Sequence, residues 1–267
     1  MCLSKILIGR YISGDSLVYK MDPRGKLLAT IFFILIVFMA NNPLSYLIVT
    51  VFSLVAVAAT ELKPKIFWDG VKPLIWLILF TSFLQLFFTV GGKVYWRWTI
   101  FAVSSYGIEN AIFIFIRFTV IILISTVMTV TTMPLEIADA IEWILTPLKL
   151  IKVPVDKIAL VMSIALRFVP TLFDETFKIM NAQRSRGADF NNGDLITRAK
   201  AVTPLLVPLF ISSLETAIDL ATAMESRGYR GDEGRTKFRV LKWSKYDLVN
   251  LGYFAILIVL LLVFRTH

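Results

Sequence analysis

The sequence predicts an all-α, polytopic membrane protein with about five transmembrane helices and a cytoplasmic coupling domain. Of its 267 residues, 57% are hydrophobic, whereas soluble domains are about 45–50% apolar, and the mean hydropathy is +0.74. One stretch differs, because residues 133–245 carry 16 Lys/Arg and 13 Asp/Glu. We therefore expect transmembrane helices within residues 1–132, a coupling domain at 133–245 and a last transmembrane helix at 246–267.

The formal charge of +9 is better explained by lysine and arginine kept on the cytoplasmic side of a membrane than by nucleic-acid binding. No nucleic-acid partner is expected, and the lipid bilayer is the expected surroundings. The single cysteine, Cys2, excludes an internal disulfide framework and a cysteine-based metal cluster. The first apolar run follows a polar, basic segment, so we expect no cleavable signal peptide.

The first two expected spans form a helical hairpin. Apolar runs at residues 27–40 and 44–60 are separated by Asn-Asn-Pro at 41–43. Each run is somewhat short of the roughly 20 residues that a spanning helix needs. The intervening turn nevertheless favours two helices over one long helix.

The third and fourth spans are expected at residues 73–90 and 107–130. The segment between them, 93–106, is rich in Tyr and Trp, as is typical of a membrane–water interface. A fifth span is expected at 248–264, although a sixth is not excluded by hydropathy.

Short loops predict the orientation. The N-terminal tail carries five Lys/Arg and the loop 61–72 carries three lysines, whereas the loop 91–106 carries only Lys93 and Arg97. The positive-inside rule therefore places the N-terminus in the cytoplasm, and four spans return the chain there near residue 132.

The coupling domain is expected to contain a short amphipathic helix at 135–145 and two long ones at 155–186 and 194–227. Each long helix has an apolar first half and a polar second half. The apolar halves alone could be two further spans. We favour amphipathic rods at the cytoplasmic face because charges inside a bilayer are costly, and these helices contain such charges: Arg167, Glu215 and Asp219. Three prolines, which remove intrahelical hydrogen bonds, are expected to bend the rods: Pro170, Pro204 and Pro208.

Both long helices end in the same pattern, A-x-x-S-R-G, at residues 182–187 and 223–228. The glycine follows the last good helix former, which suits a left-handed cap residue. Arg186 and Arg227 are therefore expected at the helix ends. One such ending would be explained by the helix dipole alone. Two copies that agree at four of six positions favour a paired docking device for acidic grooves.

The chain lacks the motifs of common membrane enzymes and ATPases. Its single histidine is His267, and it contains no G-x-x-x-x-G-K-[ST] loop, so a non-catalytic subunit without its own phosphate-binding loop is expected. Arg117 falls inside the fourth span. It either contacts a partner or substrate path, or pairs within the bundle, for example with Gln85 or Ser82.

The two arginine motifs, with residues 8–16 (Ile-Gly-Arg-Tyr-Ile-Ser-Gly-Asp-Ser) and 21–24 (Met-Asp-Pro-Arg), carry a family resemblance. The chain resembles the transmembrane (T) component of energy-coupling factor (ECF) vitamin transporters, the EcfT/CbiQ-like family. The family motif is commonly Ala-Arg-Gly. Here Ser185 and Ser226 occupy the small-residue position, so close packing in a groove is still expected.

The resemblance implies a bacterial plasma-membrane importer with four parts. This chain would join two cytoplasmic ABC ATPase subunits, which bind ATP and Mg, to one substrate-binding S component, and S components could be exchangeable. No cofactor is expected in this chain. The two long helices would cross beneath the S component and transmit ATP-driven motion to it.

The resemblance also implies two sets of site residues. The ATPase-docking residues would be Ser185, Arg186, Gly187, Ser226, Arg227 and Gly228. The residues facing the S component would be Ile164, Phe168, Pro170, Pro204, Leu205 and Pro208. Two alternatives stay open: a membrane-bound enzyme for lipid or isoprenoid substrates that uses the basic loop 229–245, and a stand-alone permease with Arg117 in its solute site.

Overall fold

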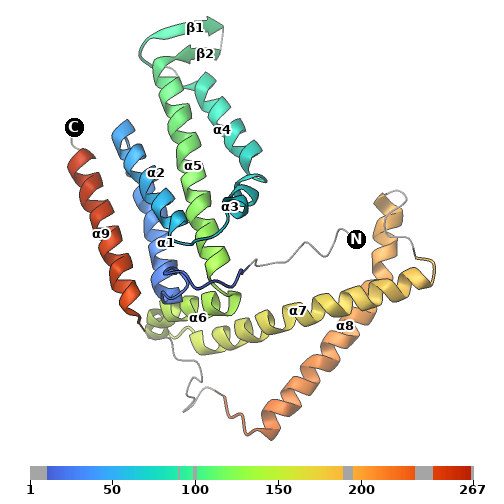
Figure 1. Cartoon of the computed structure of the whole chain (residues 1–267). Helices are drawn as coiled ribbons and strands as arrows, with labels where there is room; N and C mark the ends of the chain where they lie inside the picture. The colour runs from blue at the N-terminus through green and yellow to red at the C-terminus, as the bar shows by residue number, and fades with distance from the viewer. Residues whose placement is uncertain (1–10, 90, 99–100, 189–194, 232–242, 266–267) are drawn as a thin grey trace. The chain divides into compact units, whose positions relative to one another are not determined.

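The computed structural model describes residues 11–89, 91–98, 101–188, 195–231 and 243–265 (Figure 1). The predicted features at Cys2, at residues 8–10, at the helix start Asp194, in most of the basic loop and at His267 lie outside these residues. The chain divides into two compact units. Unit 1 is Met1–Ala140 with Leu241–His267, and unit 2 is Ile141–Val240.

Unit 1 is a helical bundle with one small hairpin. Its elements are α1 (Pro23–Val37), α2 (Pro43–Ala58), α3 (Pro64–Val71), α4 (Ile75–Phe88), β1 (Val94–Trp98), β2 (Phe101–Ser104), α5 (Ser105–Thr131) and α9 (Lys245–Arg265). Helix α6 (Pro134–Leu145) runs across the division between the units. Unit 2 continues with the 3-10 helix η2 (Thr146–Ile151), α7 (Val155–Ser185) and α8 (Leu195–Ser226). The predicted all-α class is confirmed.

Local sequence explains where the helices of unit 1 begin. The Asp22 carboxylate accepts a hydrogen bond from the Arg24 amide at 2.8 Å, and Pro23 occupies the first helical position of α1. The Ser104 hydroxyl accepts from the Gly107 amide at 3.0 Å at the start of α5. Each side chain satisfies an amide that has no partner within the helix.

Helix α5 is the centre of unit 1, because it packs against α1, α2, α3 and α4 (Figure 1). The largest buried cluster joins α1, α2, α5 and α9 through Phe33, Ile36, Val37, Val49, Phe52, Val120, Ile124, Leu257 and Leu261. The Tyr253 ring stacks on the Phe52 ring, and its hydroxyl donates to the Phe52 carbonyl oxygen at 2.5 Å. This stacked pair of rings thus fixes α9 against α2.

A buried polar cluster joins the first turns of α1 and α9 to the end of α5. The Asp247 carboxylate accepts hydrogen bonds from the Asp22 amide at 2.9 Å and from the Ser244 amide at 2.7 Å. The Lys26 ammonium donates to the Thr131 carbonyl oxygen at 3.1 Å. These contacts join segments that are far apart in the sequence.

The substitution Asp247→Ala is expected to destabilise unit 1. Asp247 is only 5% exposed, so its removal leaves the buried Asp22 amide and the partly buried Ser244 amide without their acceptor, at about 1–3 kcal/mol for the buried one. The midpoint of thermal unfolding in detergent micelles should fall clearly. The exposed Asp69 offers a matched control, since Asp69→Ala should leave the midpoint within error. Equal midpoints for both variants would contradict this role of Asp247.

Length and composition divide the helices into groups. Helices α5 and α9 are long and apolar enough to cross a membrane, as is Val202–Ser226 of α8. Helix α2 is apolar but shorter, and α1 has 15 residues. The interpretation of α8 as a rod outside the bilayer stays a prediction, which rests on the exposed charges Glu215 and Asp219.

The third predicted span, 73–90, contains helix α4 and is longer than it. The helix there, α4, has only 14 residues, about 21 Å at 1.5 Å per residue, against a hydrocarbon core of about 30 Å. It pairs with α3 across a bend of 58°, so the two form a broken span or a re-entrant segment. Pro64 begins α3 at its first position, whereas the sequence analysis treated this stretch as a loop.

The aromatic segment 93–106, for which the sequence analysis noted only an interfacial composition, contains a β-hairpin. Strands β1 and β2 are antiparallel, with Val94 opposite Ser104 and Trp98 opposite Phe101. A register shift interrupts the pairing between Val94 and Trp96. The abundance of aromatic and β-branched residues in this segment favours strands.

Candidate coupling site

Helices α7 and α8 cross within unit 2 (Figure 1). A shallow hollow of about 270 Å³ marks the crossing. Helix α7 contributes Ile164, Phe168, Thr171, Leu172 and Glu175 to its lining, and α8 contributes Ser212, Ser213, Thr216, Ala217, Leu220 and Ala221. The small residues of α8 allow close approach of the two backbones. The C-terminal ends of the helices lie at different tips of the crossed pair (Figure 1).

The two helices end in the same hydrogen-bonded cap. At α7, the Gly187 amide donates to the Arg184 carbonyl at 3.0 Å and the Ala188 amide donates to the Gln183 carbonyl at 3.0 Å. This pair of bonds is the Schellman motif. Gly187 has a φ of 88°, the left-handed conformation that favours glycine.

Helix α8 repeats this geometry bond for bond. The Gly228 amide donates to the Glu225 carbonyl at 2.9 Å and the Tyr229 amide donates to the Met224 carbonyl at 3.0 Å. Gly228 has a φ of 75°. The sequence repeat A-x-x-S-R-G is therefore also a structural repeat, and the arginine holds the same place in both caps.

The predicted docking residues are accessible in both caps. Ser185, Arg186, Gly187, Ser226, Arg227 and Gly228 are all exposed. The Ser185 hydroxyl donates to the Asn181 carbonyl at 3.2 Å, and the Ser226 hydroxyl donates to the Ala223 carbonyl at 3.1 Å. Each serine hydroxyl is thus turned back onto its own helix.

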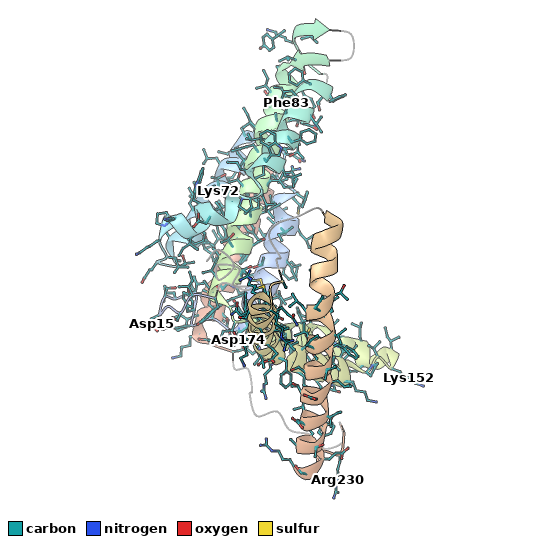
Figure 2. The ribbon with its side chains drawn as sticks, turned by 90° about the vertical axis from the view of Figure 1, so that its right-hand side faces the viewer. Asp15, Lys72, Phe83, Lys152, Asp174 and Arg230 are labelled. Carbon is teal, nitrogen blue, oxygen red and sulfur yellow. The ribbon has the colours of Figure 1, made fainter. Side chains whose placement is uncertain are left out.

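Neither arginine of the repeat is paired within the part of the chain that the structure describes. Arg186 and Arg227 make no side-chain hydrogen bond or ion pair to a described residue. Arg230, labelled in Figure 2, lies just beyond the α8 cap and is also exposed. A guanidinium presents five donors in a fixed plane and stays charged. The two tips can therefore bind carboxylates.

The described residues contain no group of three or more His, Cys, Asp or Glu side chains that could hold a metal ion.

The intramembrane cation Arg117 lies on α5. Its guanidinium donates to the Tyr46 hydroxyl on α2 and lies 5.3 Å from the Phe38 ring centroid and 5.6 Å from the Tyr46 ring centroid. Tyr46 stacks in turn on Phe113 at 4.5 Å.

The predicted partners Gln85 and Ser82 are not the residues that contact Arg117. The Ser82 hydroxyl instead donates to the Ala111 carbonyl at 3.0 Å. The reading of Arg117 as part of a pair within the bundle was right in kind, but it named the wrong helix. Cation–π contacts with aromatic faces replace a carboxylate partner among the described residues.

Comparison with known proteins identifies the family to which the chain belongs. A family model described as CbiQ, cobalt transport protein, matches residues 14–238. An energy-coupling factor transporter transmembrane protein EcfT from Lactobacillus helveticus (strain DPC 4571) is 75% identical over 265 residues, which cover 99% of this chain and 96% of that protein. The chain belongs to the CbiQ/EcfT family of energy-coupling factor transporter transmembrane components.

Other members of the CbiQ/EcfT family are similar over nearly their whole length. The EcfT protein of Lacticaseibacillus paracasei is 52% identical over 98% of this chain and 100% of that protein. The EcfT 1 protein of Listeria monocytogenes serotype 1/2a (strain 08-5578) is 49% identical over 99% of both. The chain is therefore a multi-pass membrane subunit of an energy-coupling factor transporter, and the resemblance found in its sequence is confirmed.

The residues of this CbiQ/EcfT chain that the sequence analysis assigned to an S component lie in different surroundings. Ile164 and Phe168 line the hollow between α7 and α8. Pro170 and Pro204 are exposed, whereas Leu205 and Pro208 are half-buried. Helices α7 and α8 continue through all three prolines. A role of these six residues in binding the S component stays a prediction.

The structure shows an apolar stripe on α8 that the sequence analysis missed. Its six members, which we call the α8 stripe, are 50–69% exposed: Leu206, Val207, Phe210, Ile211, Leu214 and Ile218. None of them lines the hollow that faces α7. Their spacing of three and four residues follows one helix face. That periodicity is present in the sequence and could have identified them, but the residues predicted on α8 were Pro204, Leu205 and Pro208.

Proposed function

We propose that this chain is the energy-coupling subunit of an importer for vitamins or other micronutrients. In this proposal it transmits ATP-driven motion of two cytoplasmic ATPase subunits to one membrane-embedded S component. The observation that carries the proposal is the pair of identical caps on α7 and α8, each with an exposed, unpaired arginine among the described residues. Two helix ends with the same cap and the same arginine suit two related ATPase subunits.

The caps provide defined attachment points. A Schellman cap fixes the backbone around its arginine, so little conformational entropy is lost when the side chain docks. Serine before the arginine is small and turned back onto the helix, which leaves room for a groove to close on the tip. ATP and Mg would be bound by the ATPases and not by this chain.

Transmission requires that the ATPases bind the tips differently in their two nucleotide states, because a partner with equal affinity for both states shifts nothing. Helices α7 and α8 touch at their crossing. A change in the separation of their tips therefore acts on the packing at the crossing. Partners that pull the tips together or apart would change the angle between the helices.

The α8 stripe supports an S component as the second partner. Six exposed apolar side chains on one helix face are normally covered by protein or lipid. The stripe ends at Ile218, before the cap that begins near Met224. Helix α8 thus separates an apolar surface for a membrane protein from a cationic end for a soluble one. The N-terminus would lie in the cytoplasm, on the side of the ATPases.

Affinity purification from the native membrane tests the proposal. A tagged chain, extracted in mild detergent, should bring with it two nucleotide-hydrolysing subunits and one small membrane protein, identified by mass spectrometry. The purified complex should hydrolyse ATP, and vesicles that contain it should take up the substrate of the S component.

Two outcomes would favour the alternatives. Solute binding by the chain purified alone would support a stand-alone permease. Turnover of lipid or isoprenoid substrates by the isolated chain would support a membrane-bound enzyme. Either result, in the absence of co-purified ATPases, would contradict the coupling role.

A further inference from the structure

A cavity of about 330 Å³ lies within unit 1, between helices that the coupling mechanism does not use. It is bounded by α1, α2, α5, α9 and the segment that precedes α1. Side chains that share an apolar, mostly aromatic or aliphatic character form its wall, among them Phe33, Phe52, Ile124, Met128, Tyr253 and Phe254. Its volume lies at the small end of the range for ligand sites, about 300–1,000 Å³.

The wall includes the polar residues Tyr246 and Asn250, and three further polar side chains of the wall are hydrogen-bonded within the protein. The Lys26 ammonium donates to the Thr131 carbonyl oxygen at 3.1 Å, and the Tyr253 hydroxyl donates to the Phe52 carbonyl oxygen at 2.5 Å. The Thr30 hydroxyl donates to the Lys26 carbonyl oxygen at 2.9 Å. A ligand in the cavity therefore meets an almost wholly apolar surface, which favours a hydrocarbon and disfavours water or a polar solute.

The charge near Lys26 disfavours an anionic ligand. Three carboxylates interact electrostatically with this ammonium: Glu136, Asp247 and Asp22. These carboxylates repel a second anion and so oppose its attraction to the ammonium. The cavity thus lacks the usual recognition of a fatty-acid carboxylate or a phosphate.

The rim of the cavity is open at one end of the bundle. Leu17, Val55 and Val249 belong to the wall and are 54%, 51% and 65% exposed. They belong to the segment before α1, the end of α2 and the start of α9. Helices α5 and α9 are long and apolar enough to cross a membrane, so the exposed apolar rim beside them favours contact with lipid.

We propose that this cavity binds one acyl chain of a bilayer phospholipid. The hydrocarbon enters past the exposed rim, and the headgroup stays outside, at the membrane surface. An apolar cavity in contact with lipid is filled most readily by the chains that already surround it, because no polar group has to lose its hydration. The bound chain completes the packing between α2 and α9 where protein side chains leave a gap.

Photolabelling tests the proposal. The native transporter complex is reconstituted in vesicles of phosphatidylcholine and phosphatidylglycerol that contain a phosphatidylcholine with a diazirine in one acyl chain. After irradiation, mass spectrometry locates the adducts. Labelling of Met128 and Tyr253 in the cavity wall should exceed labelling of Phe83, which is 56% exposed on α4 (Figure 2).

A pair of variants on one helix provides the control. Ala56 lines the cavity, whereas Ala58 is exposed and lies outside the wall. In Ala56→Phe the new ring occupies the cavity, and labelling of its wall should fall about tenfold, the effect of removing roughly two buried methylenes. Ala58→Phe should be labelled like the wild type. Ala29→Phe fills the same cavity from α1 and serves if Ala56→Phe does not fold.

Three outcomes would overturn the proposal. The first is equal labelling of the wall in Ala56→Phe, Ala29→Phe and Ala58→Phe, with normal unfolding midpoints. The second is labelling of the wild-type wall that does not exceed that of Phe83, as expected if another part of the chain fills the cavity. The third is labelling by a diazirine fatty acid that excess phosphatidylcholine does not displace.

Discussion

Replacing both Arg186 and Arg227 by alanine is expected to detach the ATPases and abolish uptake. Arginine is a frequent hot-spot residue, and each buried guanidinium–carboxylate contact contributes about 2 kcal/mol or more. Each ATPase then loses one contact, about 2 kcal/mol or roughly thirtyfold in affinity, and the two ATPases together lose about 4 kcal/mol, roughly a thousandfold. Both side chains are exposed, so insertion and folding of the chain should persist. Co-purification of ATPases and vesicle uptake measure the effect.

Two further variants make this test specific. Arg230→Ala removes an exposed arginine three residues beyond Arg227 and outside the repeat, and it should retain the ATPases and uptake. The double change Arg186→Lys with Arg227→Lys keeps the charge but loses the planar fork, so intermediate binding is expected. Retained ATPases and uptake in the double alanine variant would refute docking through the caps.

A double change on the α8 stripe, Phe210→Glu with Leu214→Glu, is expected to abolish uptake while the ATPases remain bound. Two carboxylates in an apolar contact with another membrane protein have to be desolvated without a partner, which costs several kcal/mol. The cap at residues 224–229 lies more than two helical turns beyond Leu214 and should keep its hydrogen bonds. Mass spectrometry of the purified complex measures which subunits are lost.

The conservative double change Phe210→Leu with Leu214→Met is the matched control. It keeps the stripe apolar and should preserve the S component and most of the uptake. Simultaneous loss of ATPases and S component in the glutamate variant would show general misfolding of α8. Full uptake in that variant would show that the stripe does not bind the S component.

Most of the secondary structure follows from local sequence signals, and the caps illustrate why. The repeat A-x-x-S-R-G predicted two helix ends with arginine beside a left-handed glycine, and the structure confirms both ends, with Gly187 and Gly228 at positive φ. A cap depends on a few neighbouring residues. Its geometry is therefore encoded within one turn of the chain.

Contacts between distant segments could not be predicted in this way. The bond from Lys26 to Thr131 joins residues 105 positions apart, and the bond from Asp22 to Asp247 joins residues 225 apart. In the sequence Lys26 reads only as one more basic residue of the N-terminal tail. The partner of Arg117 was missed for the same reason, since Tyr46 lies 71 residues away.

Helix α3 was missed for a different reason. The two helices together are apolar enough for a span, and a hydropathy profile does not show where the helix axis changes direction. The bend of 58° follows a short amphipathic helix that buries Phe67 and Val71 while Trp68 is 60% exposed. Phe67 packs with Val18 and Val127 in a buried cluster, and such contacts between distant segments cannot be read from the local sequence.

The α8 stripe has a consequence for the cell. A copy of the chain without partners would present Phe210 and its five neighbours to chaperones and membrane proteases, which recognise uncovered apolar segments. Newly made copies should then have a short lifetime unless partner subunits are synthesised at a matching rate. The amount of transporter would be set by the scarcest subunit, with surplus copies degraded.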